Sequence, residues 1–195
     1  MFNNYRAEIS FKNFDQLKQK LDFCVNKKIY KINIPCKGNI KKDFLLEVVK
    51  FIGAKYENLD VIYHYSLYHQ FYNNKNFSYT KFLNFVELNK TFNKGNEILL
   101  VSGSKKRKEF EVLNILENLK SDLSNNAKFG VAFNPYFFEE KNYKIERNRL
   151  IEKLNSYFVK SIWLQFGSEI NQLSREINFL NKIFDNSQKF IDKEI

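Results

Sequence analysis

The sequence predicts an α/β fold of the TIM-barrel type, built from about six strand–helix units. Six short apolar runs each end in a polar or small cluster, and each is followed by a stretch with helical periodicity. Strands that alternate with helices build a parallel sheet, because a right-handed crossover returns the chain in the same direction. The strands also mix apolar and polar phases, as the inner wall of a barrel does and a sheet covered on both faces does not.

The expected strands are short and follow one another at intervals that suit successive strand–helix units. They lie at Tyr5–Ser10, Ile29–Ile34, Leu59–His64, Glu97–Val101, Lys128–Phe133 and Lys160–Leu164. In a parallel sheet, ligands bind beyond the carboxyl ends of the strands, so the polar clusters after these runs mark the expected active face.

The expected helices carry apolar residues at three- and four-residue spacing. They lie at Phe14–Asn26, Lys41–Gly53, Ser78–Phe92, Arg107–Leu123, Lys144–Tyr157 and Glu169–Phe184. In the last of them, an apolar stripe runs through Ile170, Leu173, Ile177, Leu180 and Phe184. Gly53 and Gly95 are the expected C-caps of two helices. Residues 1–185 are expected to form a single barrel-like domain, and residues 186–195 a polar C-terminal tail.

Composition indicates a folded cytoplasmic protein. The formal charge of +10 would suit nucleic acid or an anionic ligand, but Lys and Glu are interspersed along the helices, as codon bias in an AT-rich genome would produce. Cys24 and Cys36 fit no metal or redox spacing, which indicates a reducing compartment. The first residues show no signal pattern, and no apolar run approaches the ~20 residues of a membrane span.

Strand alternation places several polar side chains on one phase, which would face the inside of a barrel. These are Arg6, Glu8, Lys31, Asn33, His64 and Gln165.

Five segments resemble motifs of the methylenetetrahydrofolate reductase superfamily, and the resemblance runs from Arg6 to about Phe184. Ala7–Phe11 resembles the first strand with its acidic residue, Val61–Ser66 the third-strand histidine segment, and Ile98–Ser104 the fourth-strand glycine turn. Gly130–Tyr136 resembles the fifth-strand Ala-Tyr-Pro-Glu motif, and Ile162–Phe166 the sixth-strand Gln-Phe segment. The catalytic domain of that family is a (β/α)8 barrel that binds FAD.

The chain departs from the family pattern in three ways. Ser104 stands where the family has an aspartate, the paired prolines after the first-strand acid are missing, and only six units are recognised. Six strands leave open edges that must be covered, paired or tolerated. An incomplete barrel, a truncated relative and closure through a second copy of the chain all fit this pattern.

Two residues carry the chemistry that the resemblance implies. Glu8 would be the general acid that protonates a folate nitrogen, and burial among aromatic side chains would favour its protonated form. The alternative is a carboxylate paired with Arg6, Lys31 or another inward base.

His64 would contact flavin or phosphate, or would be a satisfied core histidine. His64 and His69 lack a third convergent ligand, so no metal site is expected.

The remaining candidates are ligand contacts. A basic turn beside a helix start suits a pyrophosphate or a polyglutamate tail, or is a solvated turn. It comprises Ser102, Gly103, Ser104, Lys105, Lys106 and Arg107.

Asn134 and Tyr136 would place an aromatic ring against a flavin or pterin, or would form an ordinary loop. Asn33 and Gln165 are the expected substrate contacts, although Gln165 could instead satisfy a strand end. Cys36 lies at a strand end without an identifiable base.

Three functions follow from these residues. The first is a methylenetetrahydrofolate reductase-like protein that binds FAD and a folate, with NADH or NADPH as reductant. The second is a non-catalytic relative that keeps the ligand site, and the third is a basic RNA-binding protein. The expected partner is a small molecule rather than a membrane or a nucleic acid, together with a homo-oligomer that covers the open edges.

Overall fold

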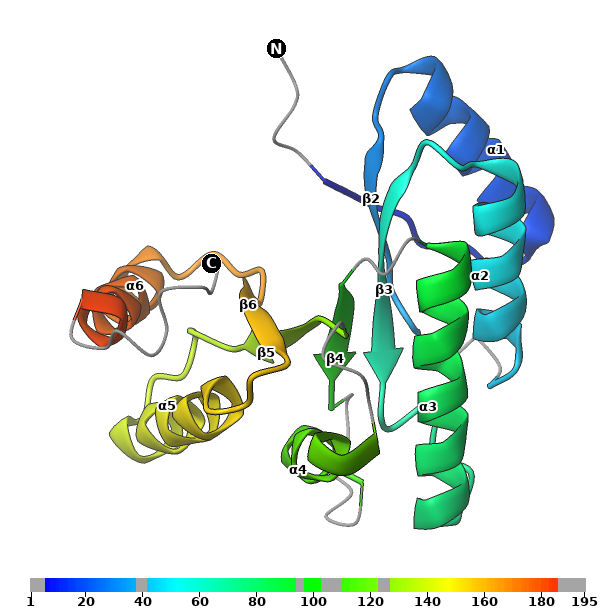
Figure 1. The fold of residues 1–195 in the computed structure, drawn as a ribbon. Helices are drawn as coiled ribbons and strands as arrows, with labels where there is room; N and C mark the ends of the chain where they lie inside the picture. Colours follow the sequence, from blue (N-terminus) through cyan, green and yellow to red (C-terminus); the bar gives the residue numbers. More distant parts are fainter. Residues whose placement is uncertain (1–5, 38–41, 94–96, 103–109, 123–126, 186–195) are drawn as a thin grey trace.

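The chain folds as an open half-barrel of six parallel strand–helix units (Figure 1). The computed structural model describes residues 6–37, 42–93, 97–102, 110–122 and 127–185. The strands are β1 (Ala7–Glu8), β2 (Lys31–Ile34), β3 (Asp60–Ser66), β4 (Ile98–Val101), β5 (Phe129–Phe133) and β6 (Val159–Leu164). They pair in chain order from β1 to β6, each parallel to the next. The predicted fold class, an incomplete TIM-like barrel, is confirmed.

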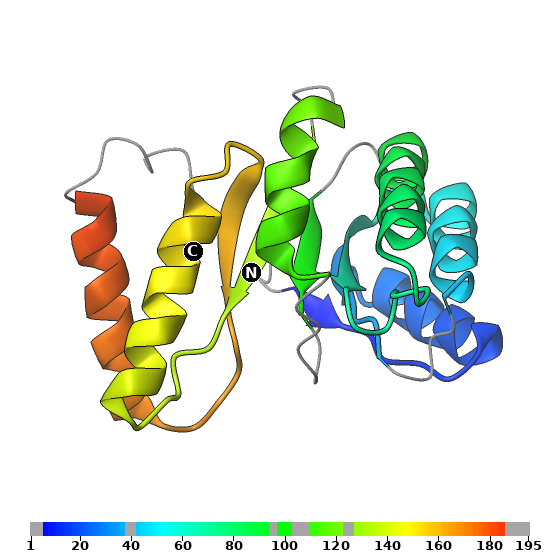
Figure 2. The same cartoon turned by 90° about the horizontal axis from the view of Figure 1, so that it is seen from below.

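The helices cover the convex side of the sheet and follow one another around it in chain order (Figure 2). They are α1 (Phe14–Asn26), α2 (Phe44–Lys55), α3 (Lys75–Phe92), α4 (Val112–Asp122), α5 (Glu140–Leu154) and α6 (Ile170–Asp185). Among the described residues, none of these helices combines the length and apolarity that crossing a membrane requires.

Several predicted boundaries move because of local capping and packing. Helix α3 begins three residues earlier than expected, since the Asn74 side chain accepts a hydrogen bond from the backbone N–H of Phe77. Gly53 was expected to cap α2, and this is wrong: it lies inside the helix. A Cβ at Gly53 would lie 2.7 Å from Cβ of Phe92, so the glycine allows the close approach of α3. Gly95 falls outside the described residues.

Strand alternation divides the sheet into a helix-facing side and a concave side. A level row of Tyr63, Ile98, Phe129 and Val159 faces the helices and is fully buried in the core. The neighbouring row on the opposite face contains His64, Leu99, Gly130 and Ser161. The alternating apolar and polar residues of the strands therefore belong to the two faces of a curved sheet, as predicted.

Helix α6 is held against α5 by an ion cluster rather than by its whole apolar stripe. Glu176 is buried and accepts hydrogen bonds from Nε and Nη2 of Arg147 at 2.7 and 3.0 Å, and from Nε of Arg175 at 2.6 Å. Leu180 is buried, as the stripe predicts, but Ile170 and Ile177 are exposed. The stripe residues therefore do not all face the core.

Candidate functional site

Polar side chains from the first three strands meet at one corner of the concave face. Glu8 on β1 lies level with Asn33 on β2, and His64 lies on the same face of β3. Nζ of Lys37, in the loop after β2, lies 3.7 Å from Oε1 of Glu8 and donates a hydrogen bond of 2.7 Å to Oγ of Ser10. We call these five residues the β1–β3 site.

Two polar atoms of this site have no hydrogen-bond partner in the described part of the chain. They are Oδ1 of Asn33 and Nε2 of His64, and both atoms are buried. The Asn33 side chain belongs to a residue that is only 8% exposed. A buried polar atom without a partner costs on the order of 1–3 kcal/mol, so such atoms are uncommon unless a ligand or water satisfies them. Both residues lie on the concave face of neighbouring strands, which marks a place suited to a hydrogen-bonding ligand.

Burial favours the neutral form of the His64 imidazole. Burial lowers its pKa from the ordinary value, the negative charge of Glu8 opposes this shift, and the ammonium group of Lys37 adds to it. A neutral imidazole both donates and accepts one hydrogen bond, so Nε2 takes either role according to the tautomer.

The lowered pKa of His64 predicts a pH-dependent stability. Below about pH 6.5 the unfolded chain binds a proton at this histidine that the folded chain does not bind until the pH falls further. The free energy of unfolding should therefore fall as the pH drops from 7.5 through 6.5 toward the folded-state pKa. Urea unfolding of the wild type and of His64→Gln at several pH values measures this slope. The slope should be smaller in His64→Gln and unchanged in the control His69→Gln; an equal slope in all three would contradict the prediction.

Glu8 differs from the expected buried acid. Its side chain is 50% exposed and pairs with Lys37 rather than with Arg6 or Lys31. Arg6 instead donates a hydrogen bond of 2.6 Å to Oδ2 of Asp60, at the amino ends of the strands, and Lys31 is exposed. The carboxylate of Glu8 therefore stands at a water-accessible rim with one cation beside it.

A second cation increases the positive charge at this rim. Nζ of Lys20 on α1 donates a hydrogen bond of 2.5 Å to the carbonyl oxygen of Ser10, the residue whose hydroxyl accepts from Lys37. The ammonium groups of Lys20 and Lys37, both hydrogen-bonded to Ser10, can attract a phosphate or carboxylate group at the edge of the β1–β3 site.

The other predicted contacts lie at the opposite end of the sheet. Oδ1 of Asn134 accepts a hydrogen bond from the backbone N–H of Tyr136, and the Tyr136 hydroxyl donates one of 3.3 Å to the carbonyl oxygen of Gly167. Gln165 is exposed just beyond β6. Strands β1 and β6 are the two edges of the described sheet, separated by five strand spacings of about 4.8 Å each. Glu8, Asn33 and His64 thus come together, whereas Asn134, Tyr136 and Gln165 form a separate group.

The predicted anion-binding turn is only partly described. The carbonyl oxygen of Ser102 accepts a hydrogen bond of 3.2 Å from the backbone N–H of Tyr68. Gly103, Ser104, Lys105, Lys106 and Arg107 lie outside the described residues.

Sequence reasoning missed a second carboxylate on the concave face. Oε1 of Glu97 accepts hydrogen bonds from the Ser161 hydroxyl at 2.5 Å and from the Trp163 indole at 2.8 Å. A Cβ at Gly130 would lie 2.5 Å from both Oε1 of Glu97 and Nε1 of Trp163, so the glycine leaves room for this cluster. Trp163 is half-buried on this face.

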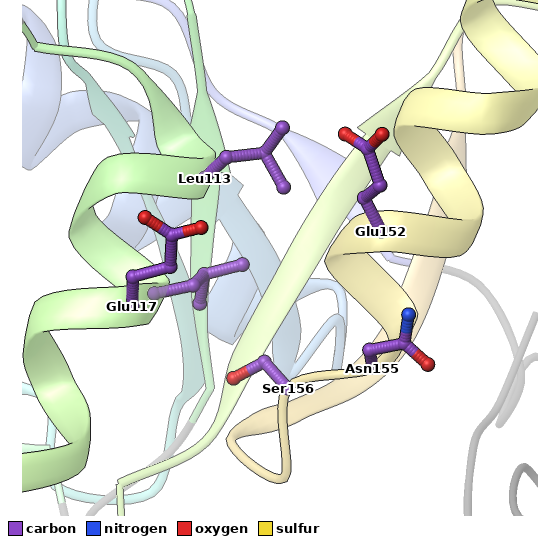
Figure 3. A pocket seen from close by; sticks show the side chains of 6 residues that line it. Leu113, Glu117, Glu152, Asn155 and Ser156 are labelled. Atoms are coloured by element: carbon purple, nitrogen blue, oxygen red, sulfur yellow. The ribbon is translucent and has the colours of Figure 1, made fainter.

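Two further features contribute no candidate chemistry. Cys36 is buried, Gln70 donates a hydrogen bond to its sulfur, and burial raises the pKa of the thiol, which disfavours a nucleophilic thiolate. A cavity of about 250 Å³ lies between α4 and the end of α5, where Glu117 and Glu152 stand on facing helices (Figure 3). It lies in the helical layer and contains none of the predicted site residues.

The described residues hold no group of three or more His, Cys, Asp or Glu side chains that could bind a metal ion. The sequence matches no known protein-family model, and a search of curated proteins finds no similar sequence.

Proposed function

We propose that the chain is a methylenetetrahydrofolate reductase-like protein that binds a flavin, a folate or both on the concave face. The observation that supports this most is the pair of unpartnered buried atoms, Oδ1 of Asn33 and Nε2 of His64, beside the Glu8 carboxylate. Flavin and pterin rings carry N–H groups and ring nitrogens that such atoms would satisfy. The residues present fit this part of such a ligand.

The rim supplies the complementary charge. Lys37 and Lys20 would attract the phosphate groups of a flavin nucleotide or the glutamate carboxylates of a folate. The ring would then lie toward Asn33 and His64, and its anionic tail toward Ser10.

If the protein is catalytic, Glu8 provides the acid. Its carboxyl group would donate a proton to a folate nitrogen while Lys37 holds the charged form of the side chain in place afterwards. A bound flavin would supply hydride chemistry that no amino-acid side chain provides, with NADH or NADPH as the source of electrons.

The second candidate is a relative that binds the ligand without turnover. It is favoured by one observation, the half-exposed position of Glu8 with Lys37 beside its carboxylate. A carboxyl group that is open to water lacks the enclosed setting in which a positioned acid is most effective.

Ligand titration tests the proposal directly. Freshly purified protein should show a flavin absorption band or should bind added FAD or tetrahydrofolate by calorimetry. Asn33→Ala should weaken that binding about tenfold, the equivalent of one lost hydrogen bond. Asn76→Ala, at an exposed position on α3, is the matched control and should bind as the wild type does.

The outcomes separate the candidates. Binding together with NADH or NADPH oxidation supports the reductase, and binding alone supports the non-catalytic relative. Colourless protein that binds neither FAD nor folates would refute both.

A further inference from the structure

Large apolar side chains are exposed where β5 and β6 end. Phe166, directly after Gln165, is 96% exposed, Ile170 at the start of α6 is 73% exposed, and Phe138 is 70% exposed. We call these three residues, with the exposed Ile177 about two turns further along α6, the β6 patch.

The two loops that carry the β6 patch are joined to each other. A Cβ at Gly167 would lie 2.5 Å from the Tyr136 ring, so that ring packs directly on the glycine beside Phe166. Nη2 of Arg175 on α6 donates a hydrogen bond of 2.8 Å to the carbonyl oxygen of Phe137. The loops that carry Phe138 and Phe166 are therefore held against each other and against α6.

The edge of the sheet lies beside this patch. Strand β6 spans six residues and pairs only with β5 within the described ranges, whereas the opposite edge strand, β1, spans only two. A long edge strand offers unpaired backbone N–H and C=O groups to another strand, a hazard that proteins usually reduce with charge or by covering the edge. Lys160 is the sole charged residue in β6.

Charge indicates what could cover this surface. The whole chain carries +10, yet residues 159–177 contain two basic residues, Lys160 and Arg175, and two acidic residues, Glu169 and Glu176. A neutral segment on a strongly basic protein is the part of the surface where a second copy can approach with the least repulsion.

The area agrees with such a contact. Phe138, Phe166 and Ile170 together leave roughly 450 Å² of apolar surface exposed, about the size of the largest apolar patch on a typical monomer, which is often functional. A stable interface needs about 800 Å² on each partner, and the β6 edge with the adjoining face of α6 would supply the remainder.

We propose that the protein forms a two-fold symmetric dimer in which the β6 edge and the β6 patch of one copy meet the same elements of the other. A two-fold interface uses one surface twice, so a neutral, apolar surface beside an open strand edge is self-complementary. This surface lies at the opposite edge of the sheet from the β1–β3 site. The test of the dimer is therefore independent of the test of the proposed function.

Sedimentation velocity or light scattering after size-exclusion chromatography tests the dimer. At micromolar concentrations the wild type should show twice the chain mass of 23.5 kDa. Phe166→Asp and, separately, Ile170→Glu should raise the dimer dissociation constant about 100-fold or more, because each substitution buries two new charges, one on each copy. Circular dichroism establishes that each variant is folded.

Phe23→Asp is the matched control, because Phe23 is an exposed phenylalanine on α1, at the other end of the molecule. It should dimerise as the wild type does. A monomeric wild type up to 100 µM would overturn the proposal, as would a dimer that survives both β6-patch substitutions.

Discussion

Replacing Glu176 by alanine is expected to lower the free energy of unfolding by about 3–5 kcal/mol, the usual cost of removing one partner from a buried ion cluster. Glu176 is 1% exposed and accepts hydrogen bonds from Arg147 and Arg175. Without the carboxylate, the two guanidinium groups remain close together with no counter-charge between them. Because a domain of this kind has a total stability of about 5–15 kcal/mol, urea unfolding followed by circular dichroism will resolve the change readily.

An exposed pair on the neighbouring helix provides the control. Glu140 forms an i,i+4 ion pair with Lys144 on α5, and both side chains are largely exposed. Glu140→Ala should leave the urea midpoint close to that of the wild type, because solvent screens such pairs. Equal midpoints for Glu176→Ala and Glu140→Ala would show that the cluster between α5 and α6 does not contribute to stability.

The strand–helix order could be predicted because the periodicity of apolar residues is local. Both ends of every strand lie within two residues of the ends of a predicted run, and the two faces follow from simple alternation. The packing of α6 could not be predicted in this way. Its apolar stripe has helical spacing, but periodicity does not reveal that the buried Glu176 pairs with Arg147 from α5 and Arg175 from α6.

The candidate site was predicted in part for the same reason. Glu8, Asn33 and His64 share a strand phase, and adjacent strands bring that phase together. Lys37 was missed because a loop places its ammonium group beside Glu8. Glu97 was missed because its long side chain crosses Gly130 to reach Trp163. This contact depends on a missing side chain on β5, two strands away from His64 and four from Glu8.

The distance between the β1–β3 site and Gln165 also follows from the fold. Alternation assigns both to the concave phase, but it does not give the separation of the two edges of an open sheet. A single ligand that contacts Glu8 must be long to reach Gln165 as well. Otherwise, two ligand molecules would be needed to contact both residues. The affinities for FAD and for tetrahydrofolate should therefore be measured separately.

Glu8→Gln is expected to reduce the rate of folate reduction by about 10²–10⁴-fold, the usual contribution of a positioned acid. Glutamine has nearly the same shape and keeps an oxygen that can contact Lys37, but it has no carboxyl proton to donate. The affinity for FAD and folate should therefore change by only a few-fold. NADH or NADPH oxidation with a methylene-folate acceptor measures the rate, and calorimetry measures the affinity.

A half-reaction makes the test specific to the acid. Bleaching of the flavin band by NADH or NADPH needs no proton from Glu8, so it should proceed in Glu8→Gln at the wild-type rate while the step that uses folate is slow. Glu87→Gln, at an exposed ion pair on α3, should leave both steps unchanged. If Glu8→Gln slows both steps equally, its role is to hold the ligand rather than to donate a proton. If folate reduction is as fast in Glu8→Gln as in the wild type, the acid must be another group, and the match of Glu8 to the first-strand motif would no longer support catalysis.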